Sequence, residues 1–114
     1  MPKPLQVATT IQSQIHSGRD SKGTSGTHMM MCWAYESPSV VYGDDNHWGG
    51  LQFHVSGFEH RGTVTVMLHY NDTYTVTFKD REGDEVHSVD YIHFPELAQV
   101  IDSYVESGEV LEDA

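Results

Sequence analysis

Carboxylates are the side chains of this 114-residue sequence whose number and spacing could do chemistry, and most of them lie late in the chain. The last 35 residues hold eleven carboxylates and one basic side chain, Arg81, whereas the first 79 residues hold six acidic and five basic ones. Such a local excess of negative charge attracts cations and basic proteins and repels nucleic acid and anionic lipid. We therefore predict a surface for a basic partner, with no direct nucleic-acid or membrane binding. Its candidate residues are Asp80, Glu82, Asp84, Glu85, Asp90, Glu96, Asp102 and Glu106.

The sequence gives no positive indication of catalysis. General acid–base chemistry favours a carboxyl group in an apolar setting, and these carboxylates are expected on turns and on a helix surface. Cys32 lies in an apolar run, where a thiol is usually inert packing, and no Gly-x-Ser-x-Gly elbow occurs. We predict that the protein is not an enzyme and uses no cofactor.

Histidine is unusually frequent, with eight residues in the chain. The close ligand pairs typical of zinc sites, such as Cys-x-x-Cys or His-x-x-x-His, do not occur, so we predict no zinc site. Asp44, Asp45 and His47 share one loop and could hold a divalent cation, although such loops are mostly plain turns. A metal-dependent activity there is our third hypothesis. His54 and His69 are expected in solvent on the polar face of a sheet.

The elements that must position these residues are predicted to form one α+β domain over residues 1–114. Apolar residues at helical spacing predict a helix that ends at Gly18. Residues 17–27 are Ser, Gly or Thr at eight of eleven positions, which predicts a flexible linker. The apolar run Met29–Tyr35 predicts a buried strand, followed by a break at Ser37-Pro38. The acidic residues 109–114 are expected to fray.

An antiparallel meander of four or five strands is predicted to follow. Alternation of apolar and polar side chains, which is typical of strands with one buried face, occurs over 51–56, 63–69 and 73–78. Aligning the apolar faces pairs Leu68 with Tyr74 and Val66 with Val76, and this register requires a left-handed Asp72 in a bulge. Residues 85–91 predict a weaker strand that contains a bulge.

The last helix is the clearest element, beginning near Pro95 and ending at Gly108. Its apolar stripe is expected to cover the apolar face of the sheet, and it consists of Leu97, Val100, Ile101, Tyr104 and Val105. Glu106 lies near the C-terminal end, where the helix dipole disfavours negative charge by about 0.3–1 kcal/mol. Helix stability therefore does not explain this carboxylate.

Most of the chain resembles a family of small, mostly uncharacterised proteins from bacteriophages, prophages and related mobile elements. The signatures are Asp72-Thr73-Tyr74-Thr75-Val76 in a hairpin and Leu97 with Ile101 in the last helix, while Met29-Met30-Met31 stands where the family has an early strand. The segment 36–50 is longer than in that family, and Tyr91-Ile92-His93-Phe94 replaces its usual acidic-Tyr sequence. The family has no agreed activity, so no functional residue carries over. The resemblance implies a mobile-element protein in the cytoplasm of a bacterial host.

Two functional hypotheses lead. The first is a non-enzymatic acidic protein that docks on a basic host protein, for example a nucleic-acid-binding defence factor, in the manner of a DNA mimic. The second is a structural or accessory protein that self-associates through the Thr-rich polar face of its sheet or an open strand edge. No apolar run approaches the length of a membrane span, and the N-terminus does not resemble a secretory signal.

Overall fold

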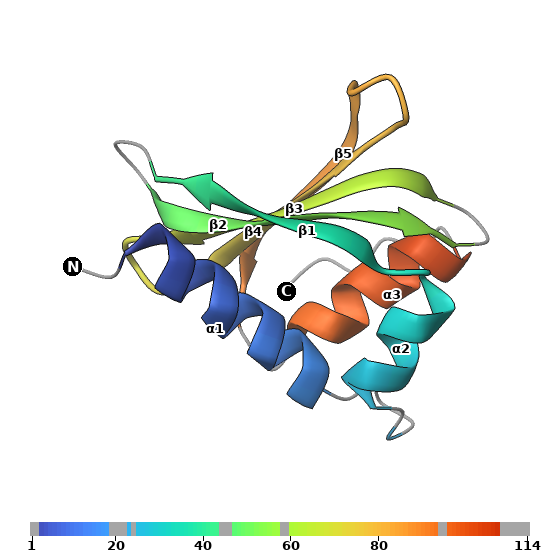
Figure 1. Ribbon diagram of the computed structural model, residues 1–114, viewed down its shortest axis with the longest axis horizontal. Coiled ribbons are helices and arrows are strands. Elements are labelled where there is room, and N and C mark those ends of the chain that lie inside the picture. Colours follow the sequence, from blue (N-terminus) through green and yellow to red (C-terminus); the bar gives the residue numbers. More distant parts are fainter. Residues whose placement is uncertain are drawn as a thin grey trace.

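Five strands pair in sequence order, β1-β2-β3-β4-β5, as one antiparallel sheet. The computed structural model describes residues 3–18, 23, 25–43, 47–57, 60–93 and 96–107. The strands are β1 (Glu36–Tyr42), β2 (His47–Ser56), β3 (Arg61–His69), β4 (Tyr74–Lys79) and β5 (Glu85–Ile92). The described helices are α1 (Pro4–Ser17), α2 (Gly26–Cys32) and α3 (Leu97–Ser107). These helices lie on one face of the sheet, and none of them covers the other face (Figure 1), which confirms the predicted α+β fold.

The buried face of the sheet follows the alternation in the sequence. Val66, Val76 and Phe78 have no exposed surface. In β4, Thr75 and Thr77 alternate with Val76 and Phe78, face the other side of the sheet and retain contact with solvent. Ile11 of α1 and Ile101 of α3 are also fully buried in the same apolar cluster. Burying each such side chain contributes about 1.5–3 kcal/mol, so the helices are held by the apolar face.

The register of the β3–β4 hairpin is the predicted one. Leu68 pairs with Tyr74, and Val66 pairs with Val76. Asp72 has a φ of 66°, the left-handed conformation that an odd-length connection requires. The Asn71 side chain supports this turn by accepting hydrogen bonds from the backbone N–H and the hydroxyl of Thr73.

The predicted strand at Met29–Tyr35 is wrong, because the first part of this run forms helix α2 and the rest a turn. Met29, Met30 and Trp33 are buried on one side of the helix, whereas Met31 is 75% exposed. A short apolar run has no periodicity that separates a buried strand from a buried helix. Cys32 ends this helix and is exposed, so its predicted place inside a strand is also wrong.

The predicted break at Ser37-Pro38 lies inside β1 and appears there as a register shift between Glu36 and Ser39. Proline is tolerated here because β1 is an edge strand, where one side of the backbone needs no partner in the ladder. The irregularity predicted for 85–91 is confirmed by two register shifts where β5 pairs with β4. The predicted fraying segment 109–114 lies outside the described residues.

A backbone contact joins the ends of helices α1 and α2. The N–H of Gly26 donates to the carbonyl of Gly18 at 2.8 Å. A Cβ atom on Gly26 would lie 1.6 Å from the carbonyl oxygen of Ile15, so only glycine fits at this position. The described ends of the predicted linker 17–27 are thus fixed to each other, and residues 19–22 and 24 lie outside the described part.

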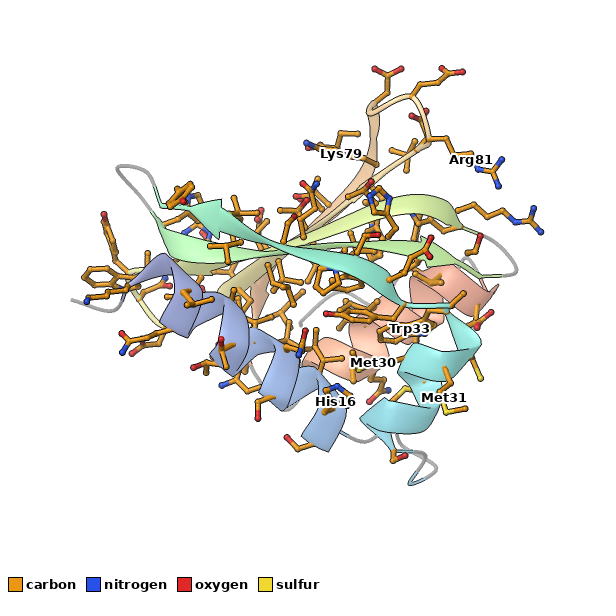
Figure 2. All side chains as sticks on the ribbon, in the orientation of Figure 1. His16, Met30, Met31, Trp33, Lys79 and Arg81 are labelled. Carbon is orange, nitrogen blue, oxygen red and sulfur yellow. The ribbon has the colours of Figure 1, made fainter. Side chains whose placement is uncertain are left out.

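Trp33 connects α2 to both the sheet and α3. Its side chain is fully buried and stacks near Phe53, with ring centroids 6.4 Å apart, and its carbonyl accepts the N–H of Ser56. The indole Nε1–H donates to Oδ1 of Asp102 at 2.8 Å. Figure 2 shows the labelled Trp33 between α2 and the sheet. Asp102 of α3 therefore holds this helix to Trp33. The sequence-based prediction that Asp102 lies on a solvated helix face is wrong.

We expect Asp102→Ala to lower the free energy of unfolding by about 1–3 kcal/mol, because the buried indole N–H would lose its acceptor. Urea denaturation measures this loss. Glu96→Ala, which removes an exposed carboxylate from the same end of the chain, should change stability by less than about 0.5 kcal/mol. In a Trp33→Phe background the Asp102→Ala change should cost much less, and equal costs in both backgrounds would contradict the assignment.

Candidate functional site

The four candidate carboxylates of the β4–β5 turn are brought together by the fold. Oδ1 of Asp80 accepts the backbone N–H groups of Glu82 and Asp84 at 2.9 and 3.0 Å. Gly83 adopts a φ of 91°, which lets the turn close. Carboxylate oxygens of Asp80, Glu82 and Asp84 lie within 4.8 Å of one another, and Glu85 follows as an exposed residue at the start of β5. The turn is therefore a compact and ordered anionic group.

Basic side chains lie close to this group. Arg61 and Arg81 line one surface hollow together with Asp80 and Glu82. Residues 79–85 hold four carboxylates and two cations, a net charge of −2. The β4–β5 hairpin projects from the sheet on the side away from the helices (Figure 1), and Figure 2 shows Lys79 and Arg81 on it. We call residues 79–85 the acidic hairpin.

The other four candidate carboxylates lie elsewhere. Asp90 is exposed on β5, and Glu96 is exposed just before α3. Asp102 is bound to Trp33, and Glu106 is half-buried in a hollow that Cys32 and Arg61 also line. Because α3 lies on the helix side of the sheet and the acidic hairpin projects on the other side, the eight candidates do not form one surface (Figure 1).

A hydrogen-bonded row of side chains crosses four strands on the face that the described helices leave open. Nε2 of His47 lies 3.2 Å from Nε2 of His69, and the same atom of His69 lies 2.7 Å from Oγ1 of Thr75. The Thr75 hydroxyl donates to Oδ1 of Asp90 at 2.8 Å. The residues come from β2, β3, β4 and β5 in that order. We call these four residues the histidine row.

The acceptor at one end of the histidine row sets the direction of its hydrogen bonds. Thr75 donates its single proton to the Asp90 carboxylate, so its oxygen must accept from Nε2–H of His69. Nε2 of His47 then faces this same N–H with its lone pair. This order differs from a nucleophilic triad, in which the hydroxyl would donate to histidine and histidine to the carboxylate. The row instead places two imidazole nitrogens side by side at one end.

Sequence reasoning missed the histidine row. It assigned His47 to a loop with Asp44 and Asp45, which lie outside the described residues, and it expected His69 in solvent. The structure places His47 at the first position of β2, directly opposite His69, with a register shift before Gly49. A strict alternation from Leu51 back to His47 would have put His47 on the buried face. The sequence does contain an excess of histidine, but this excess does not indicate which histidines lie next to each other in the fold.

A second group of histidines lies under the sheet. The rings of His60 and His87 both contact Phe78 and Tyr104, with centroids 4.3–5.9 Å apart across the group. Nε2 of each histidine is buried without a hydrogen-bond partner among the described residues. His60 is only 5% exposed, and desolvation lowers its pKa, against smaller opposing effects from the backbone of Thr63 and Lys79 and the charge of Asp80. This group has the properties of core packing.

No family model, curated protein or solved structure matches the chain. Among the described residues, no helix combines the length and the apolar character that crossing a membrane requires.

We expect the buried His60 to make the protein less stable in acid. Its pKa is lowered in the folded state, so as the pH falls through 6.5 the unfolded chain takes up a proton that the folded chain does not. The free energy of unfolding then falls, by at most about 1.4 kcal/mol per pH unit for one proton, until the pH reaches the folded pKa. Urea denaturation between about pH 8 and about pH 5 measures this dependence.

The variant His60→Gln should reduce this pH dependence, because glutamine does not titrate. His54→Gln, which alters an exposed histidine of β2, is the matched control. The assignment is wrong if His60→Gln and wild type lose stability in parallel over the whole pH range.

Proposed function

We propose that the protein is a non-enzymatic docking protein that presents its acidic hairpin to a basic protein in the cytoplasm of a bacterial host. The proposal includes an origin in a bacteriophage or another mobile element, and a target such as a nucleic-acid-binding defence protein. The observation that carries it is the convergence of Asp80, Glu82 and Asp84 within 4.8 Å on a projecting turn.

The electrostatic cost of this convergence supports a cationic partner. Two like charges 4 Å apart repel by about 1 kcal/mol in bulk water, and by more where solvent is displaced. The two N–H groups bound to Asp80 and the nearby Arg61 and Arg81 offset part of this repulsion. A partner with lysine or arginine side chains would offset more of it, and the ordered turn would lose little conformational entropy on binding.

The size of the acidic hairpin indicates which basic surface it fits. Three carboxylates in one small volume present several acceptor oxygens around a single centre, which is closer to one phosphate group than to a row of phosphates. Arginine clusters bind such acceptors through paired, charge-assisted hydrogen bonds. We therefore propose a basic pocket that normally takes a phosphate group as the docking site, a narrower form of the DNA-mimic hypothesis.

The direct test is capture of partners from bacterial lysate on the immobilised chain. The quadruple variant Asp80→Asn, Glu82→Gln, Asp84→Asn and Glu85→Gln should reduce capture at least about tenfold at low salt, because charge-assisted contacts are lost. The change Asp80→Asn keeps a side-chain acceptor oxygen for the N–H groups of the turn. Raising the salt concentration should weaken capture by the wild type and have little effect on the variant.

The matched control changes net charge equally at other places, with Glu36→Gln, Asp90→Asn, Glu96→Gln and Glu106→Gln. It should retain capture if the acidic hairpin is the docking site. Equal loss in both quadruple variants would mean that overall charge alone acts, and unchanged capture in the hairpin variant would overturn the proposal.

A second candidate function, self-association through the open sheet face, is favoured by one observation. None of the described helices covers this face, and Thr75 and Thr77 of β4 retain contact with solvent on it. The edges themselves suit pairing poorly, because β1 contains Pro38 and a register shift and β5 contains two shifts. The polar face is therefore the surface that this candidate would use.

Multi-angle light scattering tests this candidate. If the face associates, the mean molecular mass should increase as the protein concentration is raised from micromolar to near-millimolar. The variant Thr77→Lys, on this face, should then have the mass of a monomer at every concentration. Thr10→Lys, on an exposed position of α1, should have no such effect. A constant monomer mass over the whole range would remove self-association as a function.

A further inference from the structure

We propose that His47 and His69 form a binding site for a divalent transition-metal ion, of the class Zn²⁺, Ni²⁺ and Cu²⁺, through their Nε2 atoms. The site lies on the open face of the sheet and shares no residue with the acidic hairpin. It differs from the loop site considered from the sequence, because its second ligand is His69 on the neighbouring strand.

The separation of the two nitrogens fits such an ion. Metal–nitrogen bonds of about 2.0–2.1 Å at a tetrahedral angle place two imidazole nitrogens about 3.3–3.4 Å apart. The two Nε2 atoms here lie 3.2 Å apart, with ring centroids at 4.1 Å and planes inclined by 51°. The nitrogen separation is thus close to that of a chelated ion, but both lone pairs reach one ion only when the ring centroids move about 1 Å further apart, so the rings must swing outward on binding.

The backbone holds both histidines in place. His47 and His69 are direct partners in the β2–β3 ladder, and the N–H of His69 donates to the carbonyl of Thr73 at 2.9 Å. Both side chains are half-buried, which restricts their rotamers and leaves access from solvent. The ladder therefore keeps both side chains within reach of one ion.

Metal binding would rearrange the rest of the histidine row. Metal binding requires the lone pair of His69 Nε2, so its ring proton must lie on Nδ1 in the bound form. The hydrogen bond from His69 Nε2–H to Thr75 is lost in the bound form, because an ion about 2.0–2.1 Å from Nε2 in that direction would overlap the Thr75 oxygen, which lies 2.7 Å from Nε2. The His69 ring must therefore turn away from Thr75, which can keep its donation to Asp90. The Asp90 carboxylate, which accepts from Thr75, adds a negative charge on the same face of the sheet as the ion.

The donor atoms select the class of ion. Imidazole nitrogen suits Zn²⁺, Ni²⁺ and Cu²⁺, whereas Ca²⁺ and Mg²⁺ prefer oxygen ligands such as those of the acidic hairpin. Two histidines leave at least two coordination positions for water, or for donor atoms of a bound molecule. Such a site differs from a closed structural site, in which four protein ligands surround the ion.

Isothermal titration calorimetry of the full chain without a histidine tag, with zinc chloride as the probe, tests the proposal. We expect one ion per chain, and we expect His47→Ala and His69→Ala each to weaken binding at least about tenfold, since each removes one of two protein ligands. His54→Ala, on the same strand as His47 but exposed, is the matched control and should bind as the wild type does.

A spectroscopic measurement on the wild type keeps the test independent of any effect of the variants on folding. Histidine ring ¹⁵N resonances recorded during zinc titration should shift most for Nε2 of His47 and His69. The proposal is overturned if zinc shifts neither nitrogen, which would leave the pair as an ordinary hydrogen bond. It is also overturned if binding survives both histidine variants, or is lost instead when Asp80→Asn, Glu82→Gln and Asp84→Asn are combined.

Discussion

Burial of one apolar face of the five-stranded sheet is the constraint on which the rest of the structure depends. The side chains of β2, β3 and β4 alternate, so every residue that points toward the helices obliges its neighbours to point away from them. The helices α1 and α3 supply the apolar stripes that cover this face, and Trp33 brings α2 into the same cluster. The polar face follows as a consequence, and it places His69, Thr75 and Asp90 side by side across neighbouring strands.

Periodicity in the sequence was sufficient to predict the sheet and the last helix. The pairing of Leu68 with Tyr74 and the left-handed Asp72 followed from matching apolar faces, because a slip of one residue would turn every apolar side chain to solvent. The same reasoning failed at Met29–Tyr35, because every residue of this short run is apolar and its pattern cannot distinguish a strand from a helix. The break predicted at Ser37-Pro38 is a register shift inside β1, because an edge strand tolerates a proline that a central strand would exclude.

The candidate sites were predictable to a smaller extent, because charge is visible in a sequence and spatial coincidence is not. Asp80, Glu82 and Asp84 lie close together since a single tight turn contains them all. Asp102 and Glu106 were assigned to the same surface from their helical positions, but Asp102 is bound to Trp33, and Glu106 lines a different hollow, which Arg61 also borders. The pairing of His47 with His69 depends on one register shift beside Gly49, which no local pattern indicates.

The hydrogen bond from Gly26 to Gly18 has a practical meaning for work with this protein. Because Gly18 and Gly26 are hydrogen-bonded to each other, a guest domain inserted between them would be tethered at two adjacent ends. Lengthening a closed loop costs only about 0.6 kcal/mol for each doubling of its length. A fluorescent reporter could thus be carried there on the helix side, with the acidic hairpin and the histidine row both left unobstructed on the opposite side of the sheet.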